Sequence, residues 1–318
     1  MSAPVLSIEG LSLSVGNIPL TEDVSFQINA GEMVGLVGES GCGKSVTALS
    51  ILRLLPEPPI RIAAGRILFD GVDLATATPA TLAKIRGRSI GMIFQEPTTS
   101  LNPVFTVGDQ IAEPLLIHTT LGKPAARQRA ADLLETVGIP GPRQALDRYP
   151  HQMSGGQRQR VMIAIALACE PRLLIADEPT TALDVTVQAQ VLSLIDRLRR
   201  DLGLACLLIT HDLGVVAEVC ERALVMYAGR IVEEGPVQSL FAHPRHRYTR
   251  ALVDTIPSRN VPGARLPAIG GTVPAPGTRI SGCTFVDRCN AATPRCSHER
   301  PPLASHGESV VACWNPAT

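Results

Sequence analysis

The 318-residue sequence contains few aromatic residues, because phenylalanine, tryptophan and tyrosine together make up only 3% of it. Hydrophobic residues still account for 45% of the chain, so aliphatic side chains must supply most of the core. Such a composition favours parallel sheets covered by helices. The length is sufficient for one large or two ordinary domains with a sizeable core.

The sequence also has no excess of positive or negative charge, no signal-peptide pattern and no apolar stretch long enough to span a membrane. Its formal net charge is zero, which gives no overall basic field for nucleic acid. The N-terminus has neither the basic start nor the apolar stretch of a signal peptide. The longest apolar stretch, Val161 to Cys169, is far shorter than a membrane span. We therefore expect a soluble, cytoplasmic chain that binds no nucleic acid.

The eight cysteines are numerous for a cytoplasmic protein, where disulfides are a poor explanation. Four lie in apolar or motif contexts and are interpreted as packing residues. These are Cys42, Cys169, Cys206 and Cys220. The other four fall within 31 residues near the C-terminus. They are Cys283, Cys289, Cys296 and Cys313.

The last 62 residues, from position 257, differ in composition from the rest of the chain. They hold nine of the 26 prolines and no lysine. Such a segment cannot bury enough apolar area to fold alone, so it must be disordered, docked or cross-linked. Four cysteines in a reducing compartment favour a metal site over free thiols. Their spacing matches neither the common C-x2-C zinc pairs nor the ferredoxin run, which leaves the metal open.

The stretch from Gly38 to Ser45 fits the phosphate-loop pattern G-x-x-x-x-G-K-[ST]. A buried strand is predicted before it, over Met33 to Val37, and a helix after it, over Val46 to Leu55. In that context, glycines let backbone N–H groups surround a phosphate at a helix N-terminus. The alternative is a glycine-rich turn between a strand and a helix. The predicted nucleotide-binding residues of this loop are Gly38, Ser40, Gly41, Cys42, Gly43, Lys44, Ser45 and Val46.

Within the loop, Lys44 supplies a charge for the outer phosphates and Ser45 a hydroxyl for Mg²⁺. A second phosphate-site element is the apolar run that ends in Asp177 and Glu178. A strand there would deliver these carboxylates to the edge where parallel sheets bind ligands. Asp177 would hold Mg²⁺ and Glu178 would accept a proton from the attacking water. The alternative is a strand followed by a helix-capping carboxylate.

A third element is Met153-Ser-Gly-Gly-Gln157, which leads into a helix predicted over Arg158 to Cys169. Ser154 can cap that helix, and Gly155 and Gly156 let the backbone approach an anion at its N-terminus. A simple cap followed by a glycine turn is the alternative.

Taken together, the Ser-Gly-Gly-Gln sequence at Ser154 to Gln157, the phosphate loop and the Asp-Glu strand end resemble the ATP-binding cassette (ABC) ATPases. The resemblance covers about residues 5 to 255. Gln95 matches the family's Q-loop glutamine, Ala182-Leu183-Asp184 its D-loop, and His211 its switch histidine. It implies an α/β fold, with a P-loop NTPase core of mixed, largely parallel sheet. An antiparallel β subdomain and a helical insertion at about 96–167 are added to this core.

The resemblance also implies a mechanism in which two cassettes close head to tail over two ATP molecules. Ser154, Gly155, Gly156 and Gln157 would then contact the ATP held by the partner's phosphate loop, and Asp184 would cross the interface. The implied catalytic residues are Lys44, Gln95, Glu178 and His211. Ser45, Gln95 and Asp177 are the implied Mg²⁺ ligands. The family usually places an adenine-stacking aromatic where this chain has Val15, which predicts weaker binding of the base.

A narrower resemblance is to the oligopeptide/dipeptide import ATPases, a branch that includes nickel importers. It rests on residues 95–103, 149–154 and 246–252, which read QEPTTSLNP, YPHQMS and HRYTRAL. It implies a second, different ATPase subunit, two transmembrane permeases and an extracytoplasmic substrate-binding protein, with this chain on the cytoplasmic face of the membrane. The region from Ala75 to Asn102 would receive a permease helix.

The same resemblance divides the chain into a nucleotide-binding domain over 1–256 and an irregular C-terminal extension over 257–318. Similar extensions hold a [4Fe–4S] cluster, which would make Cys283, Cys289, Cys296 and Cys313 its ligands, with zinc as the second candidate. The other functions considered are import of nickel or another small solute, and a soluble ABC ATPase acting on ribosomes or nucleic acid. An iron–sulfur redox protein with a vestigial nucleotide site is a further alternative.

Overall fold

The computed structural model describes residues 3–181, 183–256, 267–278 and 280–317. No helix in these ranges is both long and apolar enough to cross a membrane. The chain divides into two compact units, which are described separately. The first unit comprises Met1–Val5, Ile28–Glu32 and Thr76–Leu208, and the second comprises Leu6–Gln27, Met33–Ala75 and Ile209–Thr318.

In the second unit, an antiparallel sheet has the strand order β2-β1-β4-β5. Its strands are β1 (Leu6–Val15), β2 (Ile18–Ile28), β4 (Ile60–Phe69) and β5 (Val72–Asp73). β1 and β4 pair antiparallel, with Leu13 opposite Ile62 and Ile8 opposite Ile67. Leu13, Ile8 and Ile67 are all buried, so this pairing joins side chains of the core. The predicted antiparallel β subdomain is therefore confirmed.

The second unit also contains the strand run β11-β12-β10-β9-β3. These strands are β3 (Met33–Val37), β9 (Arg222–Tyr227), β10 (Arg230–Pro236), β11 (Ala304–His306) and β12 (Ser309–Val311). β3 runs parallel to β9, whereas β9, β10, β12 and β11 pair antiparallel in turn. β3 is buried along its whole length, as expected of a strand covered on both faces.

Short helices and a buried aromatic cluster complete the second unit. The helices are α1 (Lys44–Ile51), α9 (Leu213–Val219), α10 (Val237–Ala242), α11 (Arg247–Asp254), the 3-10 helix η3 (Val286–Arg288) and α12 (Pro294–His298). Tyr227 of β9, Tyr248 of α11 and Phe285 pack with ring centroids 4.6 to 5.4 Å apart. Because Phe285 follows position 257, the C-terminal extension shares a core with the strand and helix that precede it.

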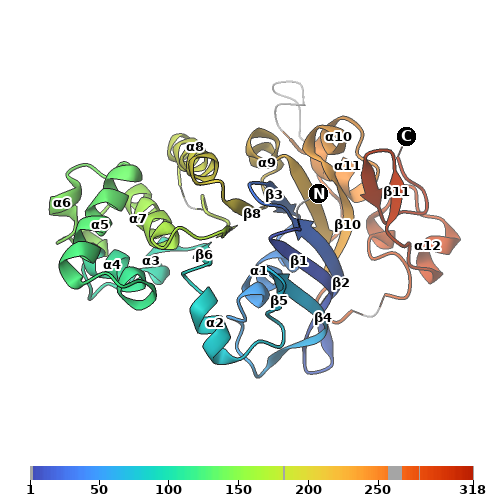
Figure 1. The fold of residues 1–318 in the computed structure, drawn as a ribbon. Helices are drawn as coiled ribbons and strands as arrows, with labels where there is room; N and C mark the ends of the chain where they lie inside the picture. Colours follow the sequence, from blue (N-terminus) through green and yellow to red (C-terminus); the bar gives the residue numbers. More distant parts are fainter. Residues whose placement is uncertain (1–2, 182, 257–266, 279, 318) are drawn as a thin grey trace. The chain divides into compact units, whose positions relative to one another are not determined.

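The first unit contains β6 (Ile90–Ile93), β7 (Leu173–Asp177) and the first four residues of β8 (Ala205–Thr210), in the strand order β8-β7-β6. β6 and β7 are parallel. Its helices are α2 (Pro79–Ile85), α3 (Pro97–Ser100), α4 (Val107–His118), α5 (Lys123–Thr136), α6 (Pro142–Ala145), the 3-10 helix η1 (Pro150–Gln152), α7 (Gly155–Leu167) and α8 (Val185–Leu202). α4, α5 and α7 pack on one another within the stretch predicted to be a helical insertion (Figure 1).

Candidate functional site

The phosphate loop lies in the second unit, between β3 and α1. Lys44, the first residue of α1, is only 4% exposed, and its Nζ donates hydrogen bonds to the carbonyl oxygens of Gly38 (2.7 Å) and Glu39 (3.0 Å). The loop carbonyl oxygens therefore bind the lysine ammonium, whereas the sequence predicted that the loop N–H groups surround a phosphate. Ser45 and Val46 follow on the first turn of the helix, and Ser40 and Gly41 are exposed.

Two glycines of this loop are required by its geometry. A Cβ on Gly38 would lie 2.2 Å from the carbonyl oxygen of Met226, so any side chain would collide with backbone. Gly43 caps α1 with a φ of 106°, which side-chain-bearing residues rarely adopt. Cys42 is buried beside them, and this burial raises the pKa of its thiol despite the nearby charge of Lys44. The thiol is thus a neutral packing group of the loop.

The first unit carries the acidic strand end. Asp177 is the last residue of β7 and is 4% exposed, and Glu178, which follows it, is 9% exposed. Glu178 has a φ of 45°, an unusual value for a residue with a side chain. Its Oε2 accepts hydrogen bonds from Gln95 Nε2 (3.2 Å) and Thr181 Oγ1 (2.8 Å). The structure therefore brings together Gln95 and Glu178, which are 83 positions apart in the sequence.

The signature sequence begins α7. Ser154 is its N-cap residue, with its Oγ 3.3 Å from Gln157 N, while Gln157 Oε1 lies 3.1 Å from Ser154 N. This reciprocal capping holds the start of the helix. A Cβ on Gly156 would come within 2.9 Å of Val187, so glycine permits close approach to α8. α7 starts at Gly155 and not at the predicted Arg158, because the cap lies at Ser154.

Asp184 caps α8 through Oδ1, which accepts from Val187 N at 2.9 Å. Ser154, Gly155 and Asp184 are exposed, and the neighbouring Val185 is an apolar residue with 84% of its surface exposed. Ala182, the first residue of the predicted D-loop, lies outside the described residues. An exposed signature, acidic cap and apolar side chain in one unit are the features of a face that another subunit could cover.

The remaining predicted nucleotide-site residues lie in the second unit. His211 follows β8 directly and is exposed, and the next residue, Asp212, caps α9 by accepting from Gly214 N at 2.7 Å. Val15 is the last residue of β1 and is half-buried opposite Ile60. The structure thus places Val15 at the strand end where the family resemblance expects an aromatic ring.

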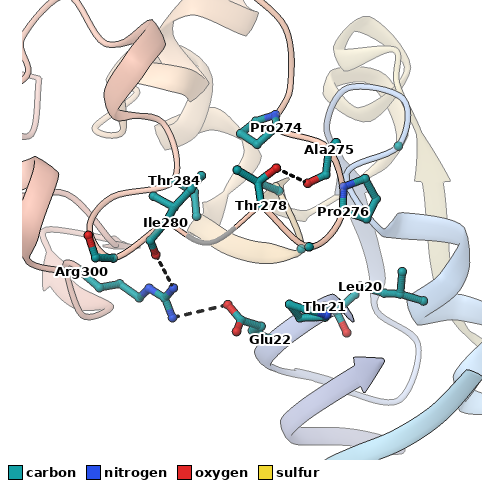
Figure 2. Close-up of a pocket in the computed structure, with 16 residues that line it drawn as sticks. Leu20, Thr21, Glu22, Pro274, Ala275, Pro276, Thr278, Ile280, Thr284 and Arg300 are labelled. Atoms are coloured by element: carbon teal, nitrogen blue, oxygen red, sulfur yellow. Dashed lines mark hydrogen bonds and ion pairs between the residues drawn. The ribbon is translucent and has the colours of Figure 1, made fainter. Parts of the chain in front are cut away.

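A cavity of about 360 Å³ adjoins the phosphate loop at Gly41. Leu20 and Thr21 line one side of it, and the turn Pro274 to Gly277 of the extension lines another (Figure 2). Thr278 holds this turn by donating from its N and its Oγ1 to the carbonyl oxygen of Ala275 at 3.0 and 2.7 Å. The volume falls in the range of small-molecule pockets.

The four cysteines of the extension line one small cavity, together with Trp314 and Asn315. Burial, followed by the proximity of the other three sulfurs, raises the pKa of Cys283 to about 11. Burial also raises the pKa of Cys313, and both of these thiols would need a bound cation to be held as thiolates. Among the described residues, no group of three or more His, Cys, Asp or Glu side chains that could hold a metal ion is found. Four cysteine sulfurs are chemically suitable ligands for a metal. In the described residues, however, they are not arranged in a coordination geometry.

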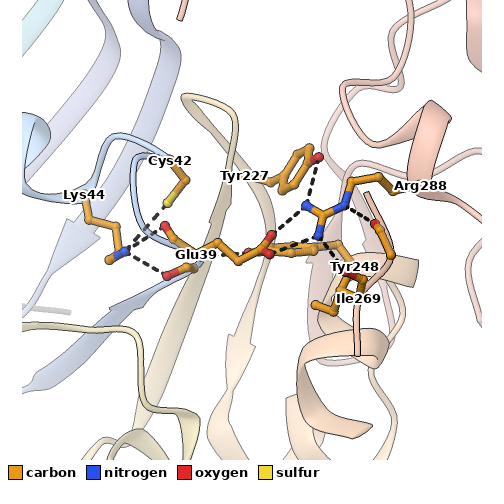
Figure 3. Close-up of polar contacts among 9 residues, drawn as sticks. Glu39, Cys42, Lys44, Tyr227, Tyr248, Ile269 and Arg288 are labelled. Atoms are coloured by element: carbon orange, nitrogen blue, oxygen red, sulfur yellow. Dashed lines mark hydrogen bonds and ion pairs between the residues drawn. The ribbon is translucent and has the colours of Figure 1, made fainter. Parts of the chain in front are cut away.

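Two residues of the second unit that contact the phosphate loop were not identified from the sequence. Arg288 of the extension forms an ion pair with Glu39, and the Tyr248 hydroxyl oxygen lies 2.8 Å from the Glu39 N–H (Figure 3). Glu39 occupies a variable position of the loop pattern, so the pattern carried no signal for it. Arg288 is 249 positions away in the sequence, and no local periodicity links the two.

Comparison with protein families supports the resemblance. A family model described as ABC transporter matches residues 21–181. A second model, described as the C-terminal region of oligopeptide/dipeptide transporters, matches residues 232–296. The two matches together span both the phosphate loop and the first three cysteines of the extension.

Curated relatives agree over nearly the whole chain. One, from Sinorhizobium fredii, is named as a peptide ABC transporter ATP-binding protein. It is 52% identical over 293 residues, which are 92% of this chain and 88% of the relative. Another, from Brucella abortus, is named as a peptide import ATP-binding protein and is 49% identical over 320 residues, covering 96% of this chain and 95% of its own.

Solved structures share the cassette fold at 28% identity. A dimeric ATP-binding cassette with bound ADP and phosphate matches with a TM-score of 0.65, covering 73% of this chain and 98% of that one. The CbiO1 subunit of an ABC transporter complex from Clostridium perfringens matches with a TM-score of 0.66, covering 76% and 92%. These matches confirm the predicted fold class. The chain belongs to the ABC transporter ATP-binding proteins, in the branch that carries the oligopeptide/dipeptide transporter C-terminal region.

Proposed function

We propose that this chain is the ATP-hydrolysing subunit of an importer for oligopeptides or dipeptides. The observation that carries the hydrolytic part is the pair formed by Gln95 and Glu178. Gln95 and Thr181 fix the Glu178 carboxylate directly after the buried strand that ends in Asp177. A fixed carboxylate beside a second acidic residue is the arrangement that phosphoryl transfer to water requires.

Each predicted residue has a chemical role in this proposal. Lys44 and the loop N–H groups bind the phosphates, and His211 acts at the γ-phosphate. Ser45, Gln95 and Asp177 would hold Mg²⁺, which when bound neutralises charge on the phosphates. Glu178 accepts the proton of the attacking water. Catalysis then consists of positioning and charge stabilisation, with no covalent intermediate on the protein.

A second cassette completes the site in this proposal. Ser154 to Gln157 would bind the γ-phosphate on the partner's phosphate loop, and Asp184 would contact the partner. The support is the exposure of Ser154, Asp184 and Val185 at the starts of α7 and α8. The similar cassette with bound ADP and phosphate is itself dimeric. We assign the partner to a different chain, because importers of the resembling branch often carry two distinct ATPases.

Two transmembrane permeases and an extracytoplasmic binding protein complete the proposed importer, with this chain attached peripherally to the membrane on its cytoplasmic side. The first unit offers a permease site, because three apolar residues after α3 and in α4 are strongly exposed. Val104 is 72%, Phe105 53% and Ile117 66% exposed. Val104 and Phe105 lie just beyond the Ala75 to Asn102 region expected to receive a permease helix, and Ile117 lies near the end of α4. Exposed apolar groups of this kind mark protein contacts.

The cavity at Gly41 is the proposed place of the nucleotide base and ribose. It is large enough for these groups, and Gly41 of the phosphate loop is one of its lining residues. Val15 offers no ring for stacking, so Leu20 and the Pro274 to Gly277 turn would supply apolar contacts instead. The base is then held mainly by van der Waals contact.

We also propose that the chain consists of a cassette over 1–256 and an extension over 257–318, in which the four cysteines hold a [4Fe–4S] cluster. The shared cavity of Cys283, Cys289, Cys296 and Cys313 supports this assignment. Thr293 N donates to Cys296 Sγ at 3.5 Å, and Asn315 Nδ2 lies 3.7 Å from the same sulfur. Such donors stabilise thiolate sulfur. The cluster would cross-link the extension and supply order, without a redox role in transport.

The test of the hydrolytic assignment is the substitution Glu178→Gln in the assembled transporter. We expect turnover of ATP to fall by about two to four orders of magnitude, because removal of a general base typically costs that much. ATP binding should persist, since the amide keeps the shape of the carboxylate. The exposed Glu170→Gln variant is the matched control. Unchanged ATP turnover in Glu178→Gln would contradict the assignment of Glu178 as the general base.

A further inference from the structure

An ion pair joins the cysteine-bearing extension to the phosphate loop within the second unit. Arg288 Nη1 lies 2.7 Å from Glu39 Oε2, and Arg288 Nη2 lies 3.0 Å from Glu39 Oε1. The Arg288 side chain is 4% exposed, whereas that of Glu39 is 29% exposed. Both carboxylate oxygens are therefore engaged by one buried guanidinium, the geometry in which arginine fixes orientation as well as charge (Figure 3).

The guanidinium is held from its other sides as well. Its Nε donates to the carbonyl oxygen of Gly270 at 2.8 Å, and its Nη1 lies 3.3 Å from the Tyr227 hydroxyl. Its central carbon lies 5.7 Å from the Tyr227 ring centroid and 5.8 Å from that of Phe285. Because these contacts come from different directions, Arg288 has little freedom to follow a displaced Glu39.

Glu39 is bound through its backbone at the same time. Its N–H donates to the Tyr248 hydroxyl at 2.8 Å, and its carbonyl oxygen accepts from Lys44 Nζ at 3.0 Å. A single residue thus connects Arg288, α11 and the lysine of the phosphate loop. A shift of the Glu39 side chain would be transmitted to the peptide that Lys44 contacts.

The orientation of the Arg288 side chain depends on backbone hydrogen bonds made by the cysteines. Arg288 ends η3, which lies between Cys283 and Cys289. Val286 N donates to Cys283 O at 3.1 Å, and Cys289 N donates to Val286 O at 3.2 Å. Cys283 N also donates to Cys296 O at 2.7 Å. The turn that carries Arg288 is therefore built on the backbone of three residues that line the sulfur cavity.

We infer that Arg288 is a positioning residue for the phosphate loop, so that the order of the cysteine module sets the affinity of the loop for ATP. The inference rests on the proposed role of this loop in ATP binding. An ion pair with a purely structural role would change the stability of the fold and leave the nucleotide affinity of the folded protein unchanged. The two roles are separated by measuring affinity and folding on the same variants.

The first experiment compares Arg288→Met, Glu39→Gln and the double variant in the full-length chain. We expect each single variant to weaken binding of a fluorescent, non-hydrolysable ATP analogue about tenfold, which is the scale of one charge-assisted hydrogen bond. In the assembled transporter, KM for ATP should rise while kcat changes less than about twofold. The double variant should be no weaker than either single variant, because both remove one interaction.

Arg295→Met is the matched control, because Arg295 lies in the same extension and pairs with exposed Glu299. Arg288→Lys should recover part of the affinity, since lysine keeps the charge and loses the paired geometry. Far-ultraviolet circular dichroism and thermal melting report whether each variant is folded. Unchanged affinity in folded Arg288→Met, or an equal loss in Arg295→Met, would overturn the inference.

The second experiment tests the link to the cysteines with Cys289→Ser, alone and combined with Arg288→Met. We expect reduced analogue affinity in Cys289→Ser and no further loss in the combination. Metal content is measured on the same samples, which keeps this inference apart from the cluster proposal. Weakened binding in Cys289→Ser, together with a wild-type chain that contains no iron either, supports the coupling and rejects the cluster. Unchanged binding in folded Cys289→Ser that has lost its iron rejects the coupling and leaves the cluster assignment standing.

Discussion

At the residue scale, Val15 stands where the family resemblance predicts an adenine-stacking aromatic ring. It ends β1 and is half-buried, with an aliphatic side chain where the family usually has a ring. We therefore predict that the base of the nucleotide has no stacking partner here, and that the phosphate contacts proposed for Lys44 and the loop do not depend on this position. Affinity should depend more on the phosphates than in other cassettes.

Restoring a ring tests this reading of Val15. We expect Val15→Tyr to tighten ATP binding about two- to tenfold, because an aromatic pair contributes about 0.5–1.5 kcal/mol beyond its buried area. The preference for ATP over GTP should change as well. Equilibrium titration with both nucleotides measures the effect, with Val15→Leu as the control that adds bulk without a ring. Equal affinities in Val15→Tyr and Val15→Leu would contradict the assignment of this position.

His246 is a second residue with a measurable consequence. Burial lowers its pKa from the ordinary 6.5 to about 4, although a backbone contact at Ala312 acts in the opposite direction. Its Nδ1 accepts the backbone N–H of Tyr248 at 3.1 Å, which requires an unprotonated nitrogen there. The unfolded chain therefore binds a proton between pH 6.5 and 4 that the folded chain does not bind.

The sign of the pH dependence follows from this difference. The free energy of unfolding should be highest above pH 6.5 and should fall as the pH drops towards 4, by about 3 kcal/mol from this residue alone. Urea unfolding at several pH values measures the slope. In His246→Asn, the side-chain amide oxygen can still accept a hydrogen bond from the N–H of Tyr248 but does not titrate. The pH dependence that His246 contributes to the free energy of unfolding should therefore be absent. Identical slopes in the two proteins would contradict the buried, neutral histidine.

At the scale of elements, the sequence located the strands and helices of the site well. β3 has the predicted bounds, and the predicted antiparallel β subdomain is present. The apolar patterns of these strands are local, so local signals were sufficient. The Ser154 cap and the Lys44 loop were likewise identified from motifs whose geometry is local.

Other features could not be predicted from local patterns. α1 spans Lys44–Ile51 and not the predicted Val46 to Leu55, and its buried positions include Thr47, Ala48 and Ile51. The contact of Arg288 with Glu39 is of the same kind, because it depends on how the extension docks on the loop.

The cysteine module allows a prediction at the same scale. Protein purified without oxygen should be brown and contain about four irons and four sulfides per chain. Serine substitutions at the four cysteines should remove the colour and make the extension sensitive to proteolysis. The matched control is serine at Cys169, a thiol outside the module. Colourless protein with one zinc per chain would contradict the cluster and assign zinc to the four cysteines.

At the scale of the whole molecule, family and fold agree along nearly the full length of the chain. The relatives are 49–52% identical over at least 92% of this sequence, and the cassette structures share its fold. The resemblance based on the nucleotide-site motifs was therefore correct about the family. In the proposed importer, the permeases and the binding protein would select the cargo.

The central claim is that ATP hydrolysis at the phosphate loop of this chain drives peptide import. It is tested most directly by uptake of a labelled oligopeptide into vesicles that contain the assembled transporter, with ATP on the side of this subunit. We predict ATP-dependent peptide uptake in the wild type and its loss in Lys44→Ala, which removes the charge that binds the phosphates. Peptide uptake that survives Lys44→Ala, or ATP-dependent uptake of nickel without any uptake of peptide, would contradict the claim.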